Sequence, residues 1–153
     1  MRFMKPSDEL LDLLAIDPGQ TVGWAWFELG DGEIKKVIAD QDNWVDFLYS
    51  LKEIVENKEC DFEVLIENYT IRTTTVAANL NKELLTAKVI GVIEWFNRKN
   101  NIKYQFQPAG IGNAFFDKQR LKEMDLWVVG KNHARDATRH GLWHLTFGRD
   151  KEE

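Results

Sequence analysis

Three short segments rich in β-forming residues follow one another between residues 10 and 39, and turn residues separate them. Leu10–Ile16 ends at Asp17-Pro18-Gly19, after which Thr21–Leu29 runs to Gly30-Asp31-Gly32. The third segment is Ile34–Ala39. Because parallel neighbours need a crossover of a dozen or so residues, strands this closely connected pair antiparallel. We therefore predict a three-stranded antiparallel meander.

Helical and strand patterns alternate after this meander. Helical periodicity of apolar residues predicts helices, and short apolar or alternating runs predict strands. The predicted helices cover residues 44–55, 76–97, 118–124 and 132–145, and the predicted strands cover 62–66 and 102–107. Strand–helix–strand units place their strands parallel. The predicted fold class is therefore α/β, a mixed five-stranded sheet in the order βββαβαβα, flanked by helices.

The composition suits one folded domain over residues 1–153. Hydrophobic residues make up 44% of the chain and there are only 3 prolines. No apolar run approaches the roughly 20 residues of a membrane span, and Met1–Glu9 lacks the apolar region of a secretory signal. The single cysteine, Cys60, excludes an internal disulfide and a cysteine-based zinc site. We expect a cytoplasmic protein that does not bind membranes.

Charge is distributed unevenly along the chain. The net charge is −5, which by itself does not favour a nucleic-acid partner. Residues 98–139, however, hold nine Lys or Arg and only four Asp or Glu. A basic segment on an acidic chain suits a polyanionic partner, although an ordinary solvated surface would have the same composition.

Four polar residues stand where predicted elements end or begin. Asp17 ends the first strand, Glu67 follows the fourth, and His133 and Asp136 lie three residues apart on one face of the last helix. Ligand sites of α/β sheets gather at such strand ends. Taken singly, these signals also fit a turn, a solvated glutamate and a surface pair. Carboxylates that converge repel one another unless a cation joins them, and oxygen ligands favour Mg²⁺ or Mn²⁺ over zinc.

These residues carry a family resemblance. Leu14–Ala25 resembles the opening motif of the RuvC-type Holliday junction resolvases of the RNase H-like superfamily, in a small bacterial or phage form. Val64–Asn68 resembles their second acidic motif. Asn132–Ala137 resembles the closing motif in the variant where a histidine replaces the first of two aspartates. The resemblance implies that Asp17, Glu67, His133 and Asp136 are the catalytic and metal-binding residues.

The resemblance also implies the activity. We expect a Mg²⁺-dependent endodeoxyribonuclease, with Mn²⁺ able to substitute, that cleaves Holliday junctions or other branched DNA by two-metal hydrolysis with ions about 4 Å apart. A homodimer with the long 76–95 helix in or beside its interface is expected, in a bacterial cell or a phage-infected host. The candidate DNA-binding residues are Tyr69, Arg72, Lys118, Arg120, Lys122, Lys131 and Arg135. Among them, Lys118 is the candidate for the scissile phosphate, and Tyr69 is the nearest candidate for an aromatic wedge.

Other interpretations remain open from the sequence. An RNase H-like nuclease acting on structured RNA has the same chemistry, and a non-catalytic nucleic-acid-binding module has the same fold. Asp17-Pro18-Gly19 with Thr21 also resembles the phosphate loop of actin-like ATPases, but 153 residues leave no room for their second domain, so we expect no nucleotide cofactor. His140 and His144 follow Asp136 on the same helix, either as buried hydrogen-bonded residues or, for His140, as a neighbour of the metals.

Overall fold

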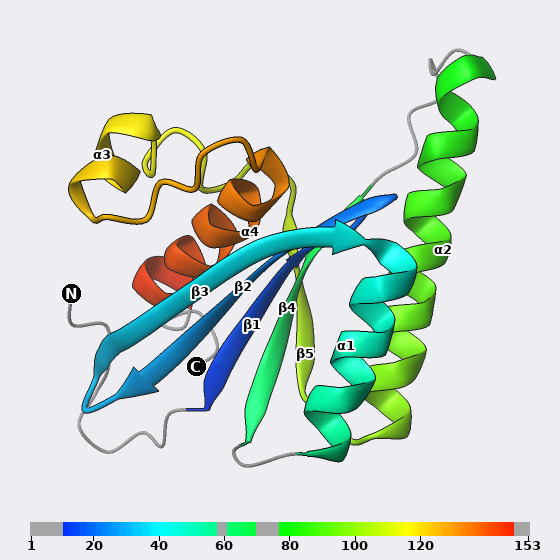
Figure 1. Ribbon diagram of the computed structural model, residues 1–153, viewed down its shortest axis with the longest axis horizontal. Coiled ribbons are helices and arrows are strands. Elements are labelled where there is room, and N and C mark those ends of the chain that lie inside the picture. The colour runs from blue at the N-terminus through cyan, green and yellow to red at the C-terminus, as the bar shows by residue number, and fades with distance from the viewer. Residues whose placement is uncertain (1–10, 58–60, 70–76, 149–153) are drawn as a thin grey trace.

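The computed structural model describes residues 11–57, 61–69 and 77–148 (Figure 1). Five strands and four α-helices follow the predicted order, and a short π-helix ends the described chain. They are β1 (Asp12–Asp17), β2 (Thr21–Gly30), β3 (Glu33–Asn43), α1 (Trp44–Glu56), β4 (Phe62–Asn68), α2 (Ala77–Lys99), β5 (Tyr104–Pro108), α3 (Lys118–Glu123), α4 (Asn132–Trp143) and η1 (His144–Gly148). Among the described residues, no helix combines the length and apolar character that a membrane crossing requires.

The strands form one mixed sheet in the spatial order β3-β2-β1-β4-β5. The meander β1–β2–β3 is antiparallel, and β4 and β5 join it in parallel on the other side of β1. The crossovers through α1 and α2 make this possible, because parallel neighbours need long connections. The predicted fold class is confirmed.

Helices cover both faces of the sheet: α1 and α2 lie on one side, and α4 with α3 on the other (Figure 1). Side chains alternate along each strand. Leu14 and Ile16 of β1 therefore enter the core under α1 and α2, whereas Leu13 and Ala15 enter the core under α4. Asp17 continues the second series, so the strand's last side chain is delivered to the α4 face.

Small residues let α4 approach the sheet closely. A Cβ atom at Gly141 would overlap the ring of Phe27 on β2, and one at Gly23 would overlap the backbone carbonyl of His133. Ala134 and Ala137 are fully buried on the same helix. This close packing sets where the first turn of α4 lies relative to the end of β1.

Two elements extend more than two residues beyond a predicted boundary. β3 continues past Ala39 to Asn43, because Gln41 and Asp42 pair with Gly23 and Val22 of β2. β3 is an edge strand of the sheet, and its polar 40–43 stretch lacks the apolar alternation that would indicate a strand. The second difference is η1, which follows α4 directly and carries the buried His144 and Leu145.

Candidate active site

Asp17 and Glu67 lie at the carboxyl ends of two neighbouring parallel strands. Ile16 of β1 pairs with Ile66 of β4, and the next residue of each strand is a carboxylate. Both side chains are delivered to the α4 face and are largely buried, with 14% and 18% of their surfaces exposed. The alternation of two adjacent strands thus places two acidic groups in contact.

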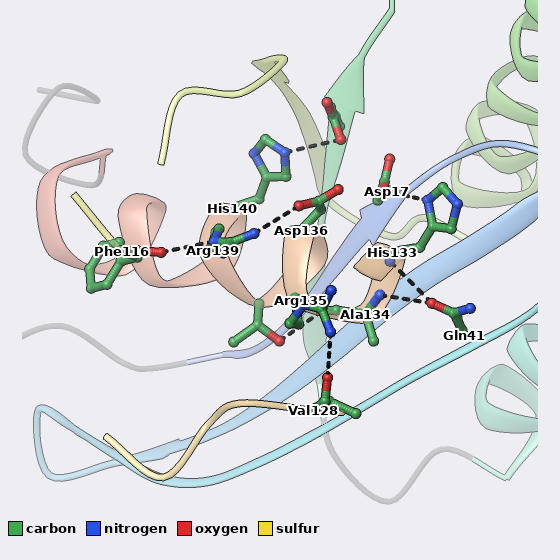
Figure 2. A network of polar contacts seen from close by, with 12 residues as sticks. Asp17, Gln41, Phe116, Val128, His133, Ala134, Arg135, Asp136, Arg139 and His140 are labelled. Carbon is green, nitrogen blue, oxygen red and sulfur yellow. Dashed lines mark hydrogen bonds and ion pairs between the residues drawn. The ribbon is translucent and has the colours of Figure 1, made fainter. Parts of the chain in front are cut away.

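The first turns of α4 add His133 and Asp136 to this pair (Figure 2). The His133 Nδ1 atom lies 3.0 Å from Asp17 Oδ2. One ligand atom from each of Asp17, His133 and Asp136 lies within 4.8 Å of the others. Glu67 does not belong to that set of three but hydrogen-bonds with Asp17. All four predicted residues therefore gather at one place.

Gln41 of β3 holds the start of α4. The Lys131 side chain makes no capping hydrogen bond at this terminus, although the first amides of a helix need acceptors. Gln41 Oε1 accepts instead from the backbone N–H groups of His133 and Ala134, at 3.1 and 3.4 Å (Figure 2). Sequence reasoning missed Gln41, because it lies 92 residues from His133 and no local pattern joins them.

The pKa values of Asp17 and Glu67 are shifted in opposite directions. Burial, together with the neighbouring carboxylates of Glu67 and Asp136, raises the pKa of Asp17 to about 9. The pKa of Glu67 is affected oppositely: burial would raise it, but hydrogen bonds with His140 and Asp17 hold it below its ordinary value. Glu67 is thus the ionised member of the pair, and Asp17 keeps a proton when no cation is near.

Glu67 has a second partner in His140, which is 1% exposed. The His140 Nε2 atom lies 3.0 Å from Glu67 Oε2. Of the two possibilities left open for His140, the structure shows the buried, hydrogen-bonded residue, and its partner is Glu67. His144 is buried as well, 3.2 Å from Gln105 and 3.7 Å from Glu63.

Asp136 is oriented by Arg139, one turn further along α4. Arg139 donates from Nη1 to Asp136 Oδ1 at 3.1 Å and from Nε to the Phe116 carbonyl at 2.8 Å (Figure 2). The spacing of three residues was the available sequence signal for this ion pair. Arg139 therefore links Asp136 to the segment that precedes α3.

The donor set fits a hard divalent cation. Carboxylate oxygens and one imidazole are suitable ligands for Mg²⁺ or Mn²⁺. The raised pKa of Asp17 marks a deficit of positive charge where the carboxylates meet. Gln107, which pairs with Glu67 across β4 and β5, has a buried Oε1 atom without a hydrogen-bond partner in the described part of the chain. These are the features of a site that a cation would complete.

Comparison with solved structures identifies the fold. RuvC of T. thermophilus, solved in complex with a Holliday junction substrate, superposes with a TM-score of 0.63 at 13% identity, over 92% of this chain and 96% of that one. The fowlpox virus Holliday junction resolvase superposes with a TM-score of 0.57 at 15% identity, over 88% and 98%. The chain has the RNase H-like fold of these resolvases. No protein-family model matches it, and no curated protein matches it in sequence.

The fowlpox resolvase in complex with Holliday junction DNA has the same fold again, with a TM-score of 0.56 at 13% identity over 87% of this chain and 97% of that one. At such identities the likeness concerns the fold alone. The predicted resemblance to the RuvC-type resolvases is confirmed at that level. The roles of the four acidic-site residues remain predictions.

Three of the predicted DNA-binding cations gather around one side chain, that of Trp127. The indole of Trp127 has Arg135 at 4.2 Å, Lys118 at 5.3 Å and Lys122 at 5.9 Å from its centre. Arg135 also donates to the Val128 carbonyl at 2.8 Å (Figure 2). We call Lys118, Lys122, Arg135 and Trp127 the Trp127 cluster. A cation over the face of an indole is attracted by the ring's electrons, so Trp127 holds these three charges near one another.

The other predicted DNA-binding residues are placed differently. Arg120 stacks on Phe115, 4.1 Å from the ring centre, and Lys131 forms a 2.6 Å ion pair with Asp40 of β3. The Tyr69 hydroxyl donates to Glu83 of α2 at 2.9 Å, and 38% of the residue is exposed. Arg72 lies outside the described residues, as does Cys60.

Proposed function

We propose that this protein is a Mg²⁺-dependent, structure-selective endodeoxyribonuclease that cleaves Holliday junctions or other branched DNA. The observation that carries the proposal is the gathering of Asp17, Glu67, His133 and Asp136 at the carboxyl ends of β1 and β4, on a fold shared with solved resolvases. Two of those resolvases are solved with Holliday junction DNA. We further propose one nuclease domain over residues 1–153, acting in the cytoplasm of a bacterium or a phage-infected host.

In this proposal Asp17, Glu67, His133 and Asp136 hold divalent metal. When bound, Mg²⁺ or Mn²⁺ supplies activation of water and stabilisation of the leaving 3′ oxygen. Asp17 is central, because its carboxylate contacts those of its neighbours and gives up its proton when a cation is present. Arg139 holds Asp136 in place, and Gln41 together with Gly23 holds the backbone of His133.

The Trp127 cluster is proposed to bind the phosphates of a DNA arm. Lys118 and Lys122 are exposed on α3, and Arg135 is the residue directly before Asp136. The three cations surround one indole, and neutralising phosphates with Lys and Arg is the main source of affinity for a DNA backbone. The cluster contains three of the nine basic residues of 98–139. Phosphate contacts position a duplex without reading its sequence.

A homodimer is supported by the surface of α2. Its outward face carries an apolar stripe, defined by Leu80, Leu84, Ala87, Gly91 and Trp95, and Leu80, Leu84 and Trp95 are 40%, 44% and 59% exposed. Its inward face buries the polar Glu83, Thr86 and Asn97 beside Val89 and Ile93. An apolar stripe turned to solvent is typical of a surface that binds another protein. We propose that two copies meet along this α2 stripe and so present two active sites to one junction.

A nicking assay tests this function. The protein would be incubated with four-way, three-way, flap and linear DNA and with structured RNA, each with Mg²⁺ and with EDTA, beside Asp17→Asn as the inactive control. The expected result is paired nicks in branched DNA that require the metal and Asp17. Preferential cleavage of structured RNA would show that the substrate is RNA and not branched DNA. Binding of branched DNA without any cleavage would indicate a non-catalytic module.

A further inference from the structure

Two histidines of α4 contact the two carboxylates supplied by the central strands. His133 lies 3.0 Å from Asp17 of β1, and His140 lies 3.0 Å from Glu67 of β4. Seven residues, about two helical turns, separate the histidines and place them on one face of the helix. Of these two histidines, the resemblance to resolvases assigns a role only to His133.

His140 is buried at a cost. It is 1% exposed, and its Nδ1 atom has no hydrogen-bond partner within the described residues. A buried ring nitrogen without a partner destabilises the folded protein, and an apolar side chain of similar size would avoid this penalty. The contact that offsets it is the one with Glu67 Oε2. Since a carboxylate only accepts, the imidazole Nε2 carries the hydrogen in this contact.

We propose that His140 is a positioning residue for metal binding: its Nε2–H group donates to Glu67 Oε2 and fixes the carboxylate in the orientation in which it receives a divalent cation. This inference rests on the proposed function. His140 contacts Oε2, and in this proposal the second oxygen, Oε1, receives the cation. Groups that orient a metal ligand in this way typically change metal affinity by about 10- to 100-fold when removed.

The chain offers a matched control in His144. Like His140, it is buried and faces a glutamate of β4: it is 3% exposed and its Nε2 lies 3.7 Å from Glu63 Oε1. Glu63 precedes Glu67 by four residues on the same strand, about 13 Å at the usual rise, and belongs to neither the acidic site nor its motif. Replacing His144, whose Nε2 also lies 3.2 Å from Gln105, thus perturbs a second buried histidine beside a glutamate of β4, away from the site.

The experiment compares His140→Leu with His140→Gln in the full chain. Both side chains approximate the volume of histidine, and only glutamine retains an N–H donor. Mn²⁺ binding would be measured without DNA by calorimetry, thermal unfolding would report folding, and nicking of a four-way junction would be measured over a series of Mg²⁺ concentrations. His144→Leu serves as the control.

The expected result is about a 10- to 100-fold loss of Mn²⁺ affinity in His140→Leu, with affinity largely restored in His140→Gln and unchanged in His144→Leu. The Mg²⁺ concentration for half-maximal nicking should rise in parallel in His140→Leu, with the rate recovering at saturation. Equal Mn²⁺ affinity in the leucine and glutamine variants would overturn the inference, as would an equal loss in folded His144→Leu.

The two proposals fail in different ways. Wild-type protein that binds Mn²⁺ but does not cleave branched DNA contradicts the proposed function, while the comparison of the His140 variants still decides the role of this residue. Wild-type protein that takes up no Mn²⁺ overturns both. If His140→Leu does not fold, His140→Met takes its place as the variant of similar size without a donor, and its Mn²⁺ affinity is compared with that of His140→Gln.

Discussion

Gly23 of β2 lies directly beneath the backbone carbonyl of His133, and a Cβ atom at this position would overlap that carbonyl. Gly23 is also the residue that pairs with Asp17 in the sheet. One glycine therefore sets how closely the first turn of α4 approaches the end of β1. The distance between His133 and Asp17 depends on this contact.

Gly23→Ala should consequently affect both stability and activity. The added methyl group meets backbone, which cannot rotate away, so the free energy of unfolding should fall by roughly 1–3 kcal/mol. Cleavage should fall further than stability explains, because His133 is displaced from Asp17. Urea unfolding and nicking assays measure the two effects. Gly30→Ala on the same strand is the control, since its Cβ would meet only the Lys35 side chain, at 3.4 Å.

Asp17→Asn should abolish cleavage while leaving DNA binding nearly intact. The amide keeps the shape of the protonated carboxyl group but cannot supply the charge that holds a cation. Affinity for DNA comes mainly from Lys and Arg contacts with phosphates, which the substitution does not touch. Gel-shift and nicking assays on one protein preparation separate the two properties. If a folded Asp17→Asn variant lost DNA binding as well, Asp17 would have a structural role.

The raised pKa of Asp17 predicts how stability depends on pH in the absence of metal. The pKa of Asp17 is about 9 in the folded protein and about 4 in the unfolded chain. Between these pH values the folded protein binds a proton that the unfolded chain has released. The stability of wild-type protein in EDTA should therefore decrease as pH rises across that interval. Asp17→Asn carries no titrating group here, so its melting temperature should decline less between pH 5 and pH 8.5. Parallel curves for the two proteins would refute this reading of the site.

The Trp127 cluster should determine the salt dependence of DNA binding. Each phosphate contact adds roughly −0.9 to the slope of log K against log salt, so Lys118→Glu with Lys122→Glu should flatten the slope by about two units. Branched and linear DNA should be weakened together. Lys35→Glu with Lys36→Glu, on β3, is the matched charge reversal and should change neither. Equal effects from both pairs would place the DNA-binding face elsewhere.

The α2 stripe should determine the oligomeric state. Leu84→Glu puts a charge into the middle of the stripe and should convert a dimer, of twice the 17.8 kDa chain mass, into a monomer. Sedimentation velocity at micromolar concentration measures this. Val129→Glu, at a residue that is 81% exposed in the segment before α4, should leave the dimer unchanged. A wild-type protein that sediments as a monomer even with junction DNA would contradict the proposed assembly.

Local sequence patterns determined the order and type of the elements and the position of each acidic residue at the end of an element. Strand alternation is a local property with a period of two. It places Asp17 on the same face as Leu13 and Ala15, and Glu67 on the same face as Leu65. The predicted mixed sheet then brings both carboxylates to one edge. For this reason the residues of the candidate site could be chosen from the sequence.

Only the tertiary structure decided which groups support these carboxylates. Gln41 and His133 are 92 residues apart, and the contact of His140 with Glu67 joins α4 to β4. Such pairs depend on the register of the sheet and on how closely α4 packs against β2, which no local periodicity encodes. Tertiary packing also decided which face of α2 is exposed to solvent. Leu84 and Val89 are both apolar residues of this helix, but the packing of α2 on the sheet buries Val89 and leaves Leu84 exposed.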